Sequence, residues 1–135
     1  MEKVINIIHK RIFLSKLCYG FLLLLLIYEY VSKGLVSQLQ SPSLIYSNID
    51  ITYLLFNFFG VLDFIVTHYW VAVTFDISLF ITCLLCIFKP QKIIFPVLFL
   101  CLYFIYFIVY SNYGGHHLHS KIGALLICVP FLFKE

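Results

Sequence analysis

The sequence predicts an all-α integral membrane protein, a four-transmembrane-helix bundle with a short interfacial or half-inserted helix on its outer face. Three observations lead to this prediction. Hydrophobic residues make up 63% of the 135 residues and charged residues only 11%, which is more apolar surface than a soluble domain of this length can bury. Three apolar runs have the length, roughly 20 residues, that a helix needs to cross the hydrocarbon core. Lys and Arg are concentrated in segments that four spans would place on one side of the membrane.

The predicted spans form a single membrane domain, residues 1–135. The three long runs cover about 12–31, 69–88 and 93–113. A fourth run, about 116–133, reaches spanning length if its helix begins near His116, and this puts "HHLH" on its first turn. A stripe of small residues follows on that helix at four-residue steps and would allow close helix packing. It consists of Ser120, Ala124 and Cys128.

Residues 51–66 are apolar, but their polar positions recur at three- and four-residue steps and so line one face of a helix. Counting this segment as a fifth span divides Lys and Arg five inside against four outside, whereas leaving it out divides them seven to two. The positive-inside rule favours the second count, with both termini in the cytoplasm. We therefore expect residues 51–66 to form an interfacial or half-inserted helix on the outer face.

Several unusual polar residues belong to the outer face or to the outer half of a span in this topology. The candidate polar site consists of His68, Asp76, His116, His117 and His119. Neutral imidazole is a good ligand for a transition metal or haem, and His116 and His119 can face the same way on one helical turn. The alternative is that the histidines cap a helix and meet lipid headgroups. No carboxylate is close to them in sequence, so no metal site is predicted and no cofactor is required.

Asp76 and a cysteine pair lie inside the second span. A charge within the bilayer costs at least a few kcal/mol unless it is paired, so Asp76 is expected to face the bundle interior. It would serve a proton relay, bind the head of a polar ligand, or fix helix packing as a paired or protonated aspartate. Cys83 and Cys86 have the spacing of a redox pair, but their place in the span favours two buried thiols.

Taken in order, several segments resemble a known family. They are "RIFLSKLCYGFLLLL", "KGLVSQLQSPSLIYSNID", "ITYLLFNFFG" and the stretch from "LFITCLLCIFKPQK" to "IGALLICVPF". Together they resemble the amino-terminal half of the HTTM domain of vitamin K-dependent gamma-carboxylase-like proteins, in which a basic first helix is followed by an outer loop, a helix pair joined by a basic turn, and a tyrosine-rich span. The order and spacing are also similar to DoxX-like four-helix membrane proteins.

The HTTM resemblance implies a fold but no carboxylase activity. The family's Asn-His position would fall on Gly115 and His116 or on His116 and His117, with Asn112 a few residues earlier, so the asparagine is not in place. The family's catalytic lysine region lies beyond the last residue of this sequence. Glutamate carboxylation is therefore not expected, since a shared fold does not transmit function.

The sequence thus predicts a small polytopic membrane protein, an accessory or structural subunit that binds a partner membrane protein or lipid. It shows no complete catalytic set, and an enzyme is not the first expectation. The alternative is a membrane enzyme or redox module that acts on a lipid or quinone at the outer face through the candidate polar site. The expected partners are the lipid bilayer and a protein partner or a second copy of the chain, with no nucleic acid. The expected location is the bacterial inner membrane, with an organellar membrane as the alternative.

Overall fold

The computed structural model describes residues 2–39, 55, 58–113, 123, 124 and 126. The elements of this part are all helical, which confirms the predicted fold class at that level. They are α1 (Glu2–Val31), the short 3₁₀ helix η1 (Val36–Gln38), α3 (Val61–Thr67), α4 (Tyr69–Phe88) and α5 (Ile94–Tyr113). Three helices, α1, α4 and α5, are long and apolar enough to cross a membrane. The predicted fourth span at 116–133 lies almost entirely outside the described residues.

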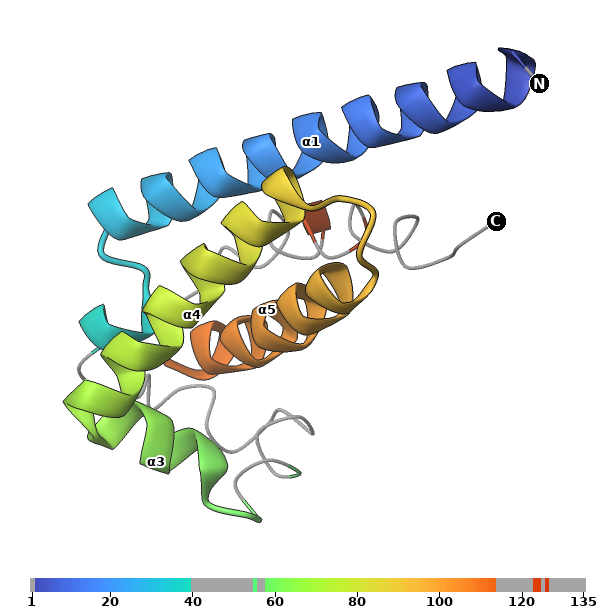
Figure 1. Cartoon of the computed structure of the whole chain (residues 1–135). Coiled ribbons are helices and arrows are strands. Elements are labelled where there is room, and N and C mark those ends of the chain that lie inside the picture. The colour runs from blue at the N-terminus through green and yellow to red at the C-terminus, as the bar shows by residue number, and fades with distance from the viewer. Residues whose placement is uncertain (1, 40–54, 56–57, 114–122, 125, 127–135) are drawn as a thin grey trace.

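The long helices match the predicted apolar runs except at the start of α1. Helix α4 covers the residues of the second run, and α5 begins at Ile94, one residue later than expected. Helix α1 begins at Glu2, ten residues before the predicted span. Hydropathy marks where the apolar segment begins, whereas the Glu, Lys, Arg and Ile residues before it all tolerate a helix. The amino-terminal part of α1 therefore projects past the other helices (Figure 1).

Helix α4 is the centre of the fold, since it packs against both α1 and α5 (Figure 1). It runs antiparallel to α1, because Cys83 of α4 lies at Tyr19 of α1 while Asp76, earlier in α4, lies at Val36, beyond the end of α1. Tyr19 also meets Phe99 of α5 edge to face, with ring centroids 5.7 Å apart. The buried core is apolar and aromatic, and its largest side chains are Tyr19, Tyr106, Phe99, Leu22, Leu26, Leu62 and Leu79.

Of the helix expected over 51–66, residues 51–54, 56 and 57 lie outside the described residues, and the described helix begins only after Gly60. This residue has φ +63°, in the left-handed region that glycine adopts without steric cost, and α3 starts directly after it at Val61. Helix α3 is therefore only seven residues long and ends at Thr67. Its Leu62 and Ile65 side chains are buried, which holds this short helix against the amino-terminal end of α4.

The carboxyl end of α1 is closed by a Schellman motif with a lysine at its left-handed position. Lys33 has φ +60°. Its N–H donates to Tyr30 O at 3.3 Å, and the Gly34 N–H donates to Glu29 O at 2.8 Å. These bonds satisfy two carbonyls that the helix end would otherwise leave open. They also turn the chain back toward α4, so that the following residues meet that helix.

Replacing Lys33 by glycine is expected to stabilise the protein by about 0.5–1 kcal/mol, because a side chain is strained in the left-handed conformation and glycine is not. Lys33→Ala is the matched control, since it removes the charge but keeps Cβ, and it should leave the stability unchanged. Unfolding of the detergent-solubilised protein by increasing SDS, followed by circular dichroism, measures both variants. An equal gain in both would assign the effect to the charge.

Candidate functional site

Asp76, a member of the predicted polar site, is buried and bound to the loop that follows α1. Its side chain is 5% exposed. The Val36 N–H donates to Asp76 Oδ1 at 3.2 Å and the Ser37 N–H donates to Oδ2 at 2.9 Å. Both donors belong to the first turn of η1, whose N–H groups have no partner within that helix. The carboxylate therefore caps η1 from a neighbouring helix and satisfies its own buried oxygens in the same contact.

Tyr106 of α5 holds the same loop from a second helix. Its side chain is fully buried, and its hydroxyl donates to Gly34 O at 3.1 Å. The backbone approaches closely here, because a Cβ built on Gly34 would collide with Glu29 Oε2 and would stand 3.3 Å from the Tyr110 ring. The Glu29 carboxylate is the end of a flexible side chain and can move, so the Tyr110 ring of α5 is the tighter limit on a side chain at this position.

These contacts form one unit, which we call the loop clamp: the Asp76 carboxylate and the Tyr106 hydroxyl bound to the backbone of Gly34, Val36 and Ser37. Three helices and the loop meet at this point. Its chemistry is hydrogen bonding to the backbone, which satisfies polar groups that burial removes from water. The sequence analysis singled out Asp76 but missed Tyr106 and Gly34, because nothing distinguishes Tyr106 from the neighbouring tyrosines Tyr103 and Tyr110.

His68 lies at the junction between α3 and α4 and is exposed. Its Nδ1 is 3.0 Å from Phe64 O and 3.1 Å from Thr67 Oγ1. The imidazole also lies against the Phe64 ring, with centroids 4.5 Å apart. One ring nitrogen is thus engaged by the residue's own turn. In sequence His68 stands eight residues before Asp76, and its described contacts are all to its own turn rather than to the loop clamp.

The other predicted site residues fall largely outside the described part of the chain. His116, His117 and His119 all lie there, as do Ser120 and Cys128 of the small-residue stripe. Ala124 is described and is buried, 2% exposed. Within the described residues, no group of three or more His, Cys, Asp and Glu side chains is arranged to hold a metal ion.

The cysteines of "CLLC" are buried thiols on the core side of α4. Cys83 and Cys86 are both 0% exposed, and neither forms a disulfide. The Cys83 Sγ lies 3.5 Å from Tyr19 O, so this thiol bridges α4 and α1. A redox pair must be reached by a reductant or oxidant, whereas these sulfurs are enclosed by the bundle. Their location therefore fits helix packing.

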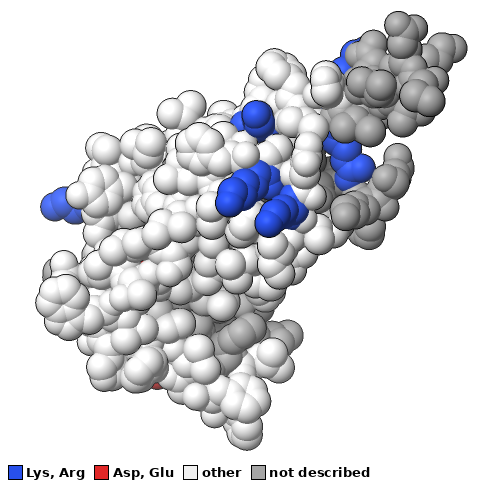
Figure 2. Space-filling view, in the orientation of Figure 1, with Lys and Arg blue, Asp and Glu red and all other residues white. Residues whose placement is uncertain are grey.

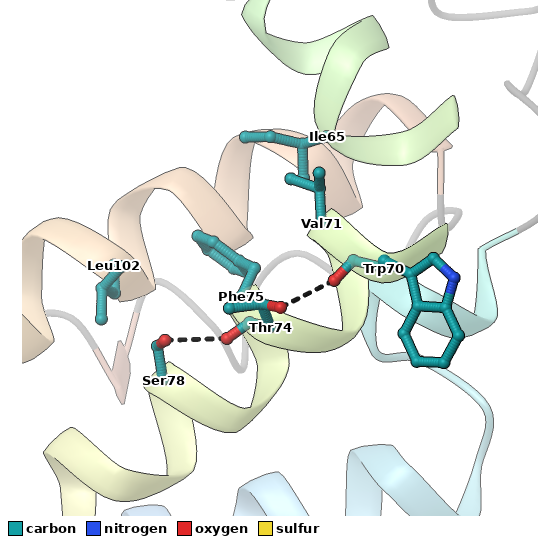
Figure 3. Close-up of a pocket in the computed structure, with 7 residues that line it drawn as sticks. All are labelled: Ile65, Trp70, Val71, Thr74, Phe75, Ser78 and Leu102. Atoms are coloured by element: carbon teal, nitrogen blue, oxygen red, sulfur yellow. Dashed lines mark hydrogen bonds between the residues drawn. The ribbon is translucent and has the colours of Figure 1, made fainter. Parts of the chain in front are cut away.

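A groove of about 450 Å³ lies on the opposite, outward side of α4. Figure 3 shows it between the end of α3, the first half of α4 and one residue of α5. Its lining consists of Ile65, Trp70, Val71, Thr74, Phe75, Ser78 and Leu102.

The two hydroxyls of this groove are satisfied within α4. Thr74 Oγ1 donates to Trp70 O and Ser78 Oγ donates to Thr74 O, each at 2.7 Å (Figure 3). Because these bonds are made four residues back along the same helix, the groove presents an essentially apolar surface to whatever enters it.

Comparison with protein-family models, curated proteins and solved structures finds no match to this chain.

Proposed function

We propose that this chain is an accessory or structural subunit of a membrane assembly and that it binds a transmembrane helix of a partner protein along the outward face of α4. The loop clamp is the observation that carries this proposal. The buried polar groups Asp76 and Tyr106 are both bound to the chain's own backbone. Because these groups are used to hold the fold, a partner would bind to the outer surface of the bundle.

A four-span topology with both termini in the cytoplasm belongs to the same proposal, in the bacterial inner membrane. The antiparallel packing of α1 and α4 supports it, because a single crossing by residues 51–66 would make those helices parallel. Trp70 at the start of α4 and Lys89 directly after its end are 19 residues apart, about 29 Å along a helix. This distance matches the thickness of the hydrocarbon core, with an aromatic side chain at one interface and a basic one at the other. In this arrangement α3 lies at the outer interface. Labelling of a cysteine placed at Lys92 from either side of the membrane tests the orientation.

The groove supports a helix as the partner rather than a flat lipid-facing surface. Thr74 and Ser78 are four residues apart, on adjacent turns of one face, and their short side chains let another helix approach. Val71 and Phe75 line the apolar part of the groove, whereas the Trp70 ring points away from it (Figure 3). By contrast, the outward face of α1 carries large exposed side chains such as Phe13 and Leu24. An apolar groove with satisfied hydroxyls gives packing contacts without an unpaired polar group.

Photo-crosslinking from inside the groove tests the proposed function. A benzoylphenylalanine at Ser78 is expected to give a protein adduct in native membranes, and Ser78→Phe should reduce recovery of that partner about tenfold or more because it fills the groove. Leu24, exposed on α1, is the control position for both experiments. Adducts of lipid mass alone, or equal protein adducts from Ser78 and Leu24, would contradict the proposal, whereas an adduct of twice the chain mass would identify a second copy as the partner.

A further inference from the structure

Most of the described cations lie at one end of the bundle. Four exposed lysines, Lys10, Lys16, Lys89 and Lys92, lie on the amino-terminal half of α1 and in the turn between α4 and α5, with the half-buried Arg11 beside them. Figure 2 shows several blue side chains grouped at this end, whereas Lys33 follows the opposite end of α1. We call the four exposed lysines the basic collar. Its lysines come from two parts of the chain that are more than 70 residues apart in sequence.

The collar lies in a narrow band along the bundle axis. Since Tyr19 and Cys83 are level with each other, a rise of 1.5 Å per residue places Lys16 about 5 Å beyond them, Lys89 about 9 Å and Lys10 about 14 Å. The band is therefore about 9 Å deep. This is comparable to the depth of the polar headgroup layer on one side of a bilayer, and it overlaps the last turn of α4, which ends at Phe88.

The acidic residues that the structure describes lie mostly away from the basic collar. Among the described residues, Glu29, Asp63 and Asp76 all lie toward the opposite end, on or near the loop clamp and α3, and only Glu2 at the tip of α1 shares the end with the collar. The described charges at this end are therefore mainly positive, at the depth expected for lipid phosphates. Lysine also suits this place, since its long stem covers apolar helix surface while the ammonium group reaches the headgroups.

We propose that the basic collar is a binding surface for anionic phospholipid headgroups, held by the lysine ammonium groups at the cytoplasmic end of the bundle. This inference rests on the proposed membrane function and names the lipid class for it. A juxtamembrane lysine strengthens association with an anionic surface by roughly fivefold, so several lysines around one headgroup give a marked preference over a zwitterionic lipid. A negatively charged leaflet would thereby fix the depth and tilt of α1 relative to the α4–α5 pair.

Native mass spectrometry of the full chain in detergent tests this proposal, with phosphatidylglycerol and phosphatidylcholine of identical acyl chains as probes. The wild-type protein is expected to bind phosphatidylglycerol about tenfold more tightly or better. Replacing the four collar lysines by glutamine should reduce this preference below about twofold, and replacing them by arginine should keep it. Lys33→Gln, at the other end of the bundle, is the matched control and should behave as wild type.

Equal binding of the two lipids by the wild-type protein, or a preference unchanged in the glutamine variant, would overturn the proposal. Release of a co-purifying acidic protein by the glutamine variant, without any lipid preference, would overturn it in favour of a protein ligand. If the fourfold variant does not fold, Lys89→Gln with Lys92→Gln changes only the exposed turn and should lower the preference severalfold. The experiment uses purified chain without a partner, so it can fail while the groove crosslinks succeed, and the reverse.

Discussion

Asp76→Ala is expected to lower the free energy of unfolding by about 3 kcal/mol. The substitution removes the acceptor of two backbone N–H groups at a buried position, and leaving such donors without a partner costs more than the net value of the bonds. Asp76→Asn should cost less, about 1–2 kcal/mol, because the amide oxygen keeps one bond while the amide nitrogen faces the second N–H group.

Unfolding by SDS, followed by circular dichroism in a mild detergent, gives this difference. Thr74→Ala is the matched control on the same helix, since its hydroxyl is bonded to its own helix and lies outside the loop clamp. In Asp76→Ala, limited proteolysis should cut within residues 34–38, while α4 and α5 remain protected. A variant as stable as wild type would mean that the Asp76 contact with η1 contributes nothing to the fold.

Tyr106→Ala is expected to lower the free energy of unfolding by about 4 kcal/mol, through the cavity left by a fully buried ring. The ring lies between two other tyrosines, with centroids 5.6 Å from Tyr103 and 6.0 Å from Tyr110, so those contacts are lost as well. Tyr106→Phe keeps the ring and removes only the hydroxyl bonded to Gly34 O, and should cost about 1 kcal/mol.

The two Tyr106 variants separate packing from hydrogen bonding in the loop clamp. Leu98→Ala, at a 45% exposed position of α5, is the control for shortening a side chain on this helix and should cost less than about 1 kcal/mol. The measurement is the same SDS titration. Equal losses for the alanine and phenylalanine variants would place the whole effect in the hydroxyl, contrary to the expected cavity. Combining Tyr106→Phe with Asp76→Asn should give a non-additive loss, because both side chains hold one loop.

The long helices could be predicted from the sequence because their signal is local. Length and apolar composition are properties of one segment, and both fix a helix in a bilayer without reference to the rest of the chain. The start of α3 after Gly60 was not predicted, because an apolar helix tolerates glycine and the left-handed conformation of this one cannot be read from its sequence. The early start of α1 was not predicted either. The charged segment before the apolar run is compatible with a helix, but hydropathy alone gives no sign that the helix includes it.

The loop clamp could be predicted only in part. A carboxylate inside an apolar span indicates a buried partner, and this directed attention to Asp76. Its partners are backbone N–H groups of Val36 and Ser37, which every residue carries, so no side-chain pattern could identify them 40 residues away. Tyr106 gave no signal at all among the tyrosines of α5. The histidines His116, His117 and His119 lie outside the described residues, and their role stays a prediction.

The pairing of Asp76 with the loop after α1 also bears on how the chain is made. During synthesis α1 and the loop leave the ribosome before α4, so the two N–H donors are already present when the segment carrying Asp76 enters the bilayer. A helix with an unsatisfied carboxylate is costly to insert by itself. The cost is lower when the N–H donors of Val36 and Ser37 are already in place to bind it. Moving α1 together with η1 to the carboxyl end by circular permutation would reverse this order, and the α4–α5 hairpin would then have to enter the membrane before the N–H donors to Asp76 exist.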